Sequence, residues 1–331
     1  VGGILTSRKR VSLPEINVNL PAVTDKDIAD IIFGVQQEVD FIAASFVRRA
    51  DDVRTVRQVI EDAGGHQAVI AKIENRQGVM NLVEILEAAD GLMVARGDLG
   101  VEMPAEEVPV IQKKIIRESN RVGKPVITAT QMLESMISRP TPTRAEASDV
   151  TNAIFDGTDA VMLSGETAIG RYPVEAVTFL AKTAKISEAA LDYEAILAEG
   201  LRFRRPVITD AISYASCATA ADLSATAIIT ATRSGSTARR VARYRPKTPI
   251  IAISSMASSL RKLHIVRGVI PLQCAPAETI DEQFSNVISS AVNAGLLSDG
   301  DLVVITAGLP LGTSGTTNMM KVYIVGDSSF S

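Results

Sequence analysis

Ala68-Val-Ile-Ala-Lys-Ile-Glu74 is a short apolar run that ends in charged side chains, and Gly91-Leu-Met-Val-Ala-Arg-Gly-Asp98 repeats this design further along the chain. Runs of this kind, separated by longer segments with helical periodicity, predict parallel strands joined by crossover helices. Three more runs of the same design are residues 41–46, 125–131 and 159–166. We therefore expect five βα repeats between about Leu20 and Leu191.

The segments between these runs carry helix boundary signals. Asp51 opens a segment that ends at Gly64, and another segment stops at Gly123. Thr143 and Glu146 have the spacing of a capping box. Pro173 stands where a helix accepts proline, in its first turn. These signals support helices between the predicted strands.

Polar side chains occur at the carboxyl end of every predicted strand, which is where β/α barrels and open α/β sheets bind their ligands. Five strands cannot close a barrel of eight. The pattern therefore indicates either an open sheet or a barrel from which about three strands are missing in this chain.

A charged stretch, Leu201-Arg-Phe-Arg-Arg-Pro206, interrupts the pattern and predicts a domain boundary. A second α/β series follows it, with helical segments between its first four strands. The predicted strands of this series are residues 225–231, 249–253, 269–272, 302–306 and 321–325. We expect a second, smaller domain built on a sheet.

Composition excludes several classes of protein. The 331 residues are 46% hydrophobic with a net charge of −4, which favours neither nucleic acid nor an anionic membrane as the partner. Cys217 and Cys274 lie far apart in apolar stretches, as reduced thiols do, so a cytoplasmic location is expected. No apolar run approaches the roughly 18 residues that span a bilayer, and no signal peptide is expected.

Three charged residues predict a metal site at the strand ends. Lys72 and Glu74 are two apart on one strand and so project to the same side, and Asp98 ends the next strand. Two carboxylates on neighbouring strand ends suit Mg²⁺ or Mn²⁺. The lysine would neutralise charge on an anionic substrate. A structural ion pair between Lys72 and Glu74 is an equally weighted alternative.

Hydroxyl groups at two further strand ends, on Thr128 and Thr130 of one strand and on Ser164 of the other, could orient a water that relays a proton. A structural role for such buried hydroxyls is the commoner case.

Six blocks of sequence occur in a fixed order along the chain. They are Lys72-Ile-Glu-Asn75, Met93-Val-Ala-Arg-Gly-Asp-Leu-Gly100, Gly123-Lys-Pro125, Thr128-Ala-Thr-Gln-Met-Leu-Glu-Ser-Met136, Arg139-Pro-Thr-Pro-Thr-Arg-Ala-Glu146 and Gly157-Thr-Asp-Ala-Val-Met-Leu-Ser-Gly-Glu-Thr-Ala168. Together the blocks resemble the signature sequences of pyruvate kinases, and the likeness extends through nearly the whole chain.

This resemblance implies an α/β fold: a (β/α)8 TIM barrel that lacks its first three strands in this chain, and a C-terminal α/β domain with a mostly parallel sheet. The implied activity is phosphoryl transfer from phosphoenolpyruvate to ADP, giving pyruvate and ATP in glycolysis, by a homotetramer. The implied domains are a remnant of an inserted cap domain, a partial barrel, a linker helix and a C-terminal allosteric domain, at residues 1–16, 17–191, 192–206 and 207–331.

The resemblance also implies roles for single residues. Glu74 and Asp98 would hold Mg²⁺ or Mn²⁺, and the backbone amides of Gly97 and Asp98 would hold the substrate carboxylate. Thr130, with Ser164 behind it, would lie near the enolate face that receives a proton. The residues assigned to catalysis are Lys72, Thr130 and Ser164. Substrate binding would involve Lys72 and Thr130 as well.

The chain departs from the family's pattern at its front. An arginine, an Asn-x-Ser motif and the usual K⁺ ligands that precede the cap are absent, as is nearly all of the cap. Val1 to Pro14 resemble the cap's last strand. We therefore expect the chain to be incomplete and not a competent kinase by itself.

Two loops rich in small and hydroxyl side chains occur in the second domain, and each by itself is more commonly a plain turn. The first loop links a strand to a helix, where backbone N–H groups can gather around phosphate. Both loops resemble the allosteric loops of pyruvate kinases, which implies a sugar-phosphate or nucleotide effector. The predicted effector residues are Thr232, Arg233, Ser234, Gly235, Ser236 and Thr237, with Gly315 and Thr316 in the second loop.

The basic group that follows the first loop, from Arg239 through Arg243 and Arg245 to Lys247, is interpreted as a solvated helix face. Two alternatives to the kinase remain open. One is a metal-dependent lyase or aldolase that acts on pyruvate or phosphoenolpyruvate through the same carboxylates. The other is a truncated, non-catalytic fragment that binds a phosphorylated effector.

Overall fold

The structure is a computed structural model that describes residues 21–310 and 315–327. The predicted cap remnant at residues 1–16 lies outside the described residues. The described chain divides into two compact units. Of the described residues, the first unit holds 21–115 and 128–131, and the second holds 116–127, 132–310 and 315–327.

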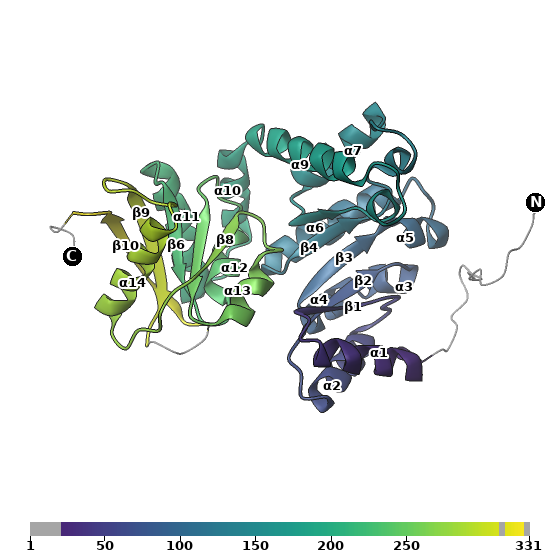
Figure 1. Cartoon of the computed structure of the whole chain (residues 1–331), viewed down its shortest axis with the longest axis horizontal. Helices are drawn as coiled ribbons and strands as arrows, with labels where there is room; N and C mark the ends of the chain where they lie inside the picture. The colour runs from purple at the N-terminus through teal and green to yellow at the C-terminus, as the bar shows by residue number, and fades with distance from the viewer. Residues whose placement is uncertain (1–20, 311–314, 328–331) are drawn as a thin grey trace, which may run out of the picture. The chain divides into compact units, whose positions relative to one another are not determined.

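The first sheet has five strands in chain order, β1-β2-β3-β4-β5, and its β1–β2 and β2–β3 pairs are parallel. Figure 1 labels β1, β2, β3 and β4 of this sheet in the purple-to-teal part of the chain. The strands are β1 (Phe41–Ala44), β2 (Ala68–Ile73), β3 (Gly91–Ala95), β4 (Val126–Ala129) and β5 (Ala160–Met162). All five predicted strands are therefore present, and each is shorter than predicted.

Helices separate these strands. They are α1 (Asp25–Gln36), α2 (Ala50–Asp62), α3 (Arg76–Met80), α4 (Leu82–Ala88), α5 (Arg96–Glu102), α6 (Val108–Val122), η1 (Glu134–Ile137), α7 (Arg144–Asp156), α8 (Gly165–Ala168), α9 (Pro173–Ala189) and α10 (Tyr193–Arg202). None of the helices in the described ranges is both long enough and apolar enough to cross a membrane.

The strand prediction for residues 91–98 is wrong at its end, because β3 stops at Ala95 and α5 begins at Arg96. Asp98 therefore lies in the first turn of a helix, where a carboxylate is favoured by the helix dipole. Within the stretch Leu201 to Pro206, which is predicted to hold a domain boundary, α10 continues to Arg202.

Local capping signals are confirmed. Thr143 Oγ1 accepts a hydrogen bond from the Glu146 amide at 3.2 Å, and Glu146 Oε2 accepts one from the Thr143 amide at 2.7 Å. Glu146 also accepts two hydrogen bonds from Ser135. Burial alone would raise the pKa of Glu146, but these hydrogen bonds outweigh burial and lower it. Pro173 begins α9 as predicted.

The second sheet has the order β10-β9-β6-β7-β8, and only its β9–β10 pair is antiparallel. This confirms the predicted mostly parallel sheet. Its strands are β6 (Ala227–Ala231), β7 (Ile250–Ser254), β8 (Val269–Gln273), β9 (Leu302–Gly308) and β10 (Thr317–Ile324), and its helices are α11 (Ile208–Asp222), α12 (Ser236–Ala242), α13 (Ala257–Leu263) and α14 (Ile280–Asn293).

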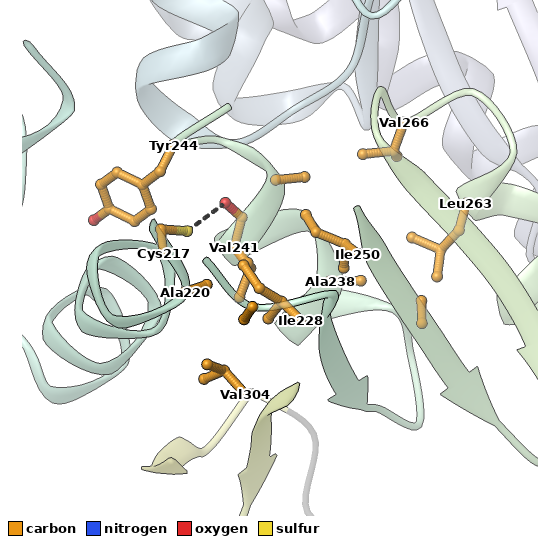
Figure 2. Close-up of a cluster of buried hydrophobic side chains, with 13 residues drawn as sticks. Cys217, Ala220, Ile228, Ala238, Val241, Tyr244, Ile250, Leu263, Val266 and Val304 are labelled. Atoms are coloured by element: carbon orange, nitrogen blue, oxygen red, sulfur yellow. Dashed lines mark hydrogen bonds between the residues drawn. The ribbon is translucent and has the colours of Figure 1, made fainter. Parts of the chain in front are cut away.

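Both faces of this second sheet are buried. Alternate strand residues face opposite ways, so that Ile228 belongs to the cluster on one face and Ile229 to the cluster on the other. Figure 2 shows the first cluster, in which Cys217 of α11 lies near Val241 of α12 and its Sγ points to the Val241 carbonyl at 3.6 Å. Val287 of α14 lies in the opposite cluster.

The interpretation of the basic group as a solvated helix face is wrong for two of its arginines. The Arg243 side chain is only 3% exposed and its Nη1 lies 3.1 Å from Oδ2 of the buried Asp210. Arg245 is 7% exposed and its guanidinium binds Asp159. Buried charges require such partners, because an unpaired charge in the interior is very costly.

Candidate active site

A lysine and a carboxylate meet at the carboxyl end of β2. Lys72 Nζ lies 2.6 Å from Glu74 Oε1, and the lysine side chain keeps 24% of its surface exposed. Lys72 Nζ also donates a hydrogen bond of 2.9 Å to Ser45 Oγ, which follows β1. The ammonium therefore lies at the edge where β1 and β2 end, with part of its surface open to an anion.

The Glu74 carboxylate is fully buried. Its Oε2 accepts a hydrogen bond of 2.6 Å from the Phe46 amide. Its Oε1 has the Lys72 ammonium beside it but no hydrogen-bond partner among the described residues. Among the described residues the Lys72 ammonium is thus the contact of Oε1, and because a carboxylate oxygen has two lone pairs, Oε1 can also bind a metal ion that shares this oxygen with the lysine.

Asp98 lies on the neighbouring element. The pairing of Ile73 with Val94 brings the ends of β2 and β3 to the same edge of the sheet, and Asp98 is exposed in the first turn of α5 just beyond β3. Within the described ranges no three or more His, Cys, Asp or Glu side chains gather around a possible metal position. A divalent ion held by Glu74 and Asp98 would need further oxygens from water or substrate, which Mg²⁺ commonly uses.

Thr130 follows β4 with a backbone conformation that is unusual for its type. Its φ is +68° and that of Gln131 is +54°. A β-branched residue rarely adopts this left-handed region, and such residues cost on the order of 1–3 kcal/mol each. Thr130 Oγ1 accepts a hydrogen bond of 2.8 Å from the Gly97 amide and donates one of 2.6 Å to the Ala129 carbonyl.

Ser164 belongs to the second unit, where it immediately precedes α8. Its amide donates to Oε2 of the buried Glu166 at 2.8 Å, and Glu166 Oε1 accepts a bond of 3.1 Å from the Leu133 amide. Glu166 therefore fixes the backbone that carries the predicted hydroxyl of Ser164.

The two predicted effector loops meet in the second unit. Thr237 Oγ1 lies 2.9 Å from Thr317 Oγ1, and both side chains are buried. Thr317 directly follows Thr316, one of the predicted effector residues. Gly235 has a φ of +79°, which glycine adopts without strain. Residues 311–314, which include part of the second predicted loop, lie outside the described residues.

Sequence reasoning missed Ser45 and Phe46, which form hydrogen bonds with Lys72 and Glu74 respectively. Ser45 and Phe46 end the first predicted strand, and the general rule that ligand-site residues follow strand ends could have identified them.

Sequence reasoning also missed Arg96, whose guanidinium contacts Thr130. Arg96 lies 34 positions before Thr130 in the sequence, so no local signal identifies the contact.

Family profiles match most of the chain. The profile described as "Pyruvate kinase, barrel domain" matches residues 1–177, and that described as "Pyruvate kinase, alpha/beta domain" matches residues 210–323.

Curated relatives are similar over nearly all of the chain. The chain is 56% identical over 327 residues to a pyruvate kinase of Geobacillus stearothermophilus, a match that covers 98% of this chain and 56% of the relative. It is 52% identical over 325 residues to one of Staphylococcus epidermidis, with the same two coverages. A pyruvate kinase of Clostridium acetobutylicum is 51% identical over 324 residues, and 68% of its length is covered. The chain thus spans a little over half the length of the first two relatives.

Proposed function

Because the chain belongs to the pyruvate kinase family, we propose that it forms part of an active site that transfers a phosphoryl group from phosphoenolpyruvate to ADP, giving pyruvate and ATP. One observation carries the proposal: the buried Glu74 carboxylate has an oxygen that meets no hydrogen-bond partner among the described residues and lies 2.6 Å from the partly exposed Lys72 ammonium. A cation ligand and a fixed positive charge at one sheet edge suit a substrate with several negative charges.

The proposal includes the architecture of the barrel. The five-stranded sheet would be part of an eight-stranded barrel whose first three strands are not in this chain, and residues 1–16 would be the end of a cap domain. Residues 17–191 would form the partial barrel, 192–206 a linker helix, and 207–331 the allosteric domain. The chain order of β1 to β5 and the greater length of the relatives support this arrangement.

Mg²⁺, or Mn²⁺ in its place, is the proposed cofactor. Its ligands would be Glu74, whose Oε1 is available, and Asp98, which is exposed at the same edge. A bound ion of this kind neutralises charge on phosphoryl oxygens. The family also uses K⁺, but this chain lacks the residues that would hold it, and we derive no step through K⁺.

The chain's own residues have the following proposed roles. Lys72 faces the negative charge that develops on the transferring phosphoryl group and on the enolate oxygen. The Gly97 and Asp98 amides hold the substrate carboxylate. Because the Gly97 amide donates to Thr130 Oγ1, a carboxylate at this amide would share that donor or replace the hydroxyl. The Thr130 hydroxyl would orient a water that delivers the proton to the enolate carbon, and the Ser164 hydroxyl is a second candidate for that role.

An effector site is proposed at the two loops of the second unit. A sugar phosphate or nucleotide phosphate would bind the backbone and hydroxyl groups of residues 232–237, with Gly315 and Thr316 beside them. The Thr237–Thr317 hydrogen bond supports this, because it brings the second loop against the first. Calorimetry with fructose 1,6-bisphosphate, ribose 5-phosphate and AMP tests it, with Ser236→Ala as the weakened variant, and absence of heat with all three would contradict it.

The expected assembly is a homotetramer in the cytoplasm. Light scattering coupled to size exclusion on the natural protein measures the assembly, and a mass equal to that of one chain would contradict the tetramer.

The proposed activity is tested on the natural protein. Its intact mass, compared with 35.2 kDa for this chain, first establishes what is being assayed. ATP formed from phosphoenolpyruvate and ADP is then measured, with Lys72→Met as the inactivating variant and Lys26→Met, an exposed lysine, as the matched control. Pyruvate formed with inorganic phosphate and without ATP would show hydrolysis and not transfer to ADP, and equal activity of the two variants would refute the role of Lys72.

A further inference from the structure

We propose that Arg96 is a positioning residue: its guanidinium holds the backbone of Thr130 and Gln131 in the left-handed conformation and so places the Thr130 hydroxyl against the Gly97 amide. The catalytic consequence of this role rests on the proposed function, whereas the structural consequence does not. Every group in the argument belongs to the first compact unit.

Two donors of the Arg96 guanidinium bind the same carbonyl. Arg96 Nη2 donates to Thr130 O at 2.6 Å and Nε donates to the same oxygen at 3.1 Å. Nη1 reaches Oε1 of the buried Gln112 at 3.4 Å. Arg96 itself is only 8% exposed. Two donors of a rigid planar group on one acceptor define the direction of the Thr130 carbonyl.

The direction of this carbonyl is coupled to the strained backbone. Thr130 and Gln131 have φ values of +68° and +54°, and neither is glycine. A residue stays in this region only when its surroundings over-determine it. Hydrogen bonds to Arg96 on the carbonyl side and to the Gly97 amide on the hydroxyl side supply two such constraints.

The position of the Thr130 hydroxyl therefore depends on Arg96, which binds the carbonyl of Thr130 and not its hydroxyl. Without the guanidinium, the carbonyl can rotate and Thr130 can relax toward ordinary strand dihedrals, which β-branched residues favour. The Thr130 hydroxyl would then leave the Gly97 amide. A lysine at position 96 could satisfy the carbonyl with one donor but could not hold its direction.

The test uses four variants. Arg96→Met removes the guanidinium, and Arg96→Lys keeps the charge without the fork. Gln131→Gly removes the cost of a positive φ at an exposed position. The matched control is Arg57→Met, because Arg57 Nη2 also donates to a backbone carbonyl, that of Ala88 at 2.9 Å, but away from Thr130.

The first measurement is hydrogen exchange of the Gly97 amide in the natural protein. We expect exchange to accelerate about tenfold to a hundredfold in Arg96→Met, the range set by losing hydrogen bonds to a charged group. Arg57→Met should leave it unchanged, and Gln131→Gly combined with Arg96→Met should restore part of the protection. Unchanged exchange in Arg96→Met, or no restoration by glycine, would overturn the proposal.

The second measurement is steady-state kinetics of the natural protein. Arg96→Met should lower kcat about tenfold or more, because the displaced Thr130 hydroxyl no longer supports proton delivery to the enolate. Added guanidinium ion should restore part of the kcat that Arg96→Met loses, and it should leave the kcat of Arg57→Met unchanged. A rise in KM alone would contradict the role. If the unaltered protein forms no ATP, the proposed function fails, and the exchange experiment still decides the role of Arg96.

Discussion

Asp159 is the acceptor at the centre of a buried network, and replacing it should destabilise the second unit more than any exposed change. Its carboxylate accepts hydrogen bonds from Arg245 Nη1 at 3.0 Å and Nη2 at 2.9 Å. It also accepts the backbone amides of Val126 at 3.0 Å and Arg267 at 3.1 Å. The Arg245 and Asp159 side chains are 7% and 5% exposed.

The expected magnitude follows from what each substitution leaves behind. Removing one partner of a buried ion pair costs roughly 3–5 kcal/mol, because the other charge stays buried. Asp159→Ala also deprives two backbone amides of their acceptor, at about 1–3 kcal/mol for each one that water does not reach. Arg245→Met leaves those two amides bonded to Asp159. We therefore expect Asp159→Ala to lose at least 3 kcal/mol and to lose more than Arg245→Met.

The assay is urea unfolding of the 331-residue chain, followed by circular dichroism because the chain contains no tryptophan. Exchange of amides in β6 and β9 separates the second unit from the first, since a chain of two units need not unfold in one step. The control is Arg54→Met, which breaks an exposed pair with Asp51 and should cost about 0.2–1 kcal/mol.

Two results would refute this reasoning. The first is an Asp159→Ala loss no larger than that of Arg54→Met, which would mean that water solvates Arg245 in the folded protein. The second is a larger loss for Arg245→Met than for Asp159→Ala, which would mean that the backbone amides of Val126 and Arg267 do not depend on this carboxylate.

Three further predictions concern single groups. Glu74→Gln should weaken Mn²⁺ binding to this chain about tenfold or more, measured by electron paramagnetic resonance, and unchanged binding would argue against Glu74 as a ligand. Burial would raise the pKa of Asp210, but its arginine partners outweigh burial and lower this pKa below the ordinary 3.8. The ionised Asp210 therefore stabilises the folded protein above about pH 3.8, and this contribution is lost as the pH falls through the pKa of Asp210 in the folded protein. Asp210→Asn should therefore be less stable than the unaltered chain at pH 7, with a gap that closes in acid unfolding below about pH 4, and a gap independent of pH would contradict this. Burial also raises the pKa of Cys217, so iodoacetamide at pH 8 should modify the half-buried Cys274 first, and equal rates would contradict the burial of Cys217.

Structural features that depend on residues close together in the sequence could be predicted. The capping box of Thr143 and Glu146 involves positions three apart, and the proline of α9 acts on its own turn. The alternation of strands and helices could also be predicted, because the apolar runs are short and the amphipathic segments between them are long. Strand existence was therefore predictable, although strand ends were not.

Features that depend on partners far away in the sequence could not be predicted. Arg243 and Arg245 belong to a basic cluster that is typical of a solvated surface. Their carboxylate partners lie 33 and 86 positions earlier, in Asp210 and Asp159. Composition records the charges of such a cluster but not their pairing, and only pairing allows a charge to be buried.

The conformation at the end of β4 could not be predicted from the sequence. Residues 125–131 read as one continuous strand, since Thr128 and Thr130 both favour extended dihedrals. In the structure the strand stops at Ala129, and Thr130 turns into a region that its side chain opposes. Local preference is overcome there by a guanidinium 34 positions away, which binds the carbonyl that an extended Thr130 would point elsewhere. The contact with buried Arg96 thus accounts for the unfavourable backbone conformation of Thr130. Conflicts between local conformational preference and the folded structure are most often found where a protein positions a functional group.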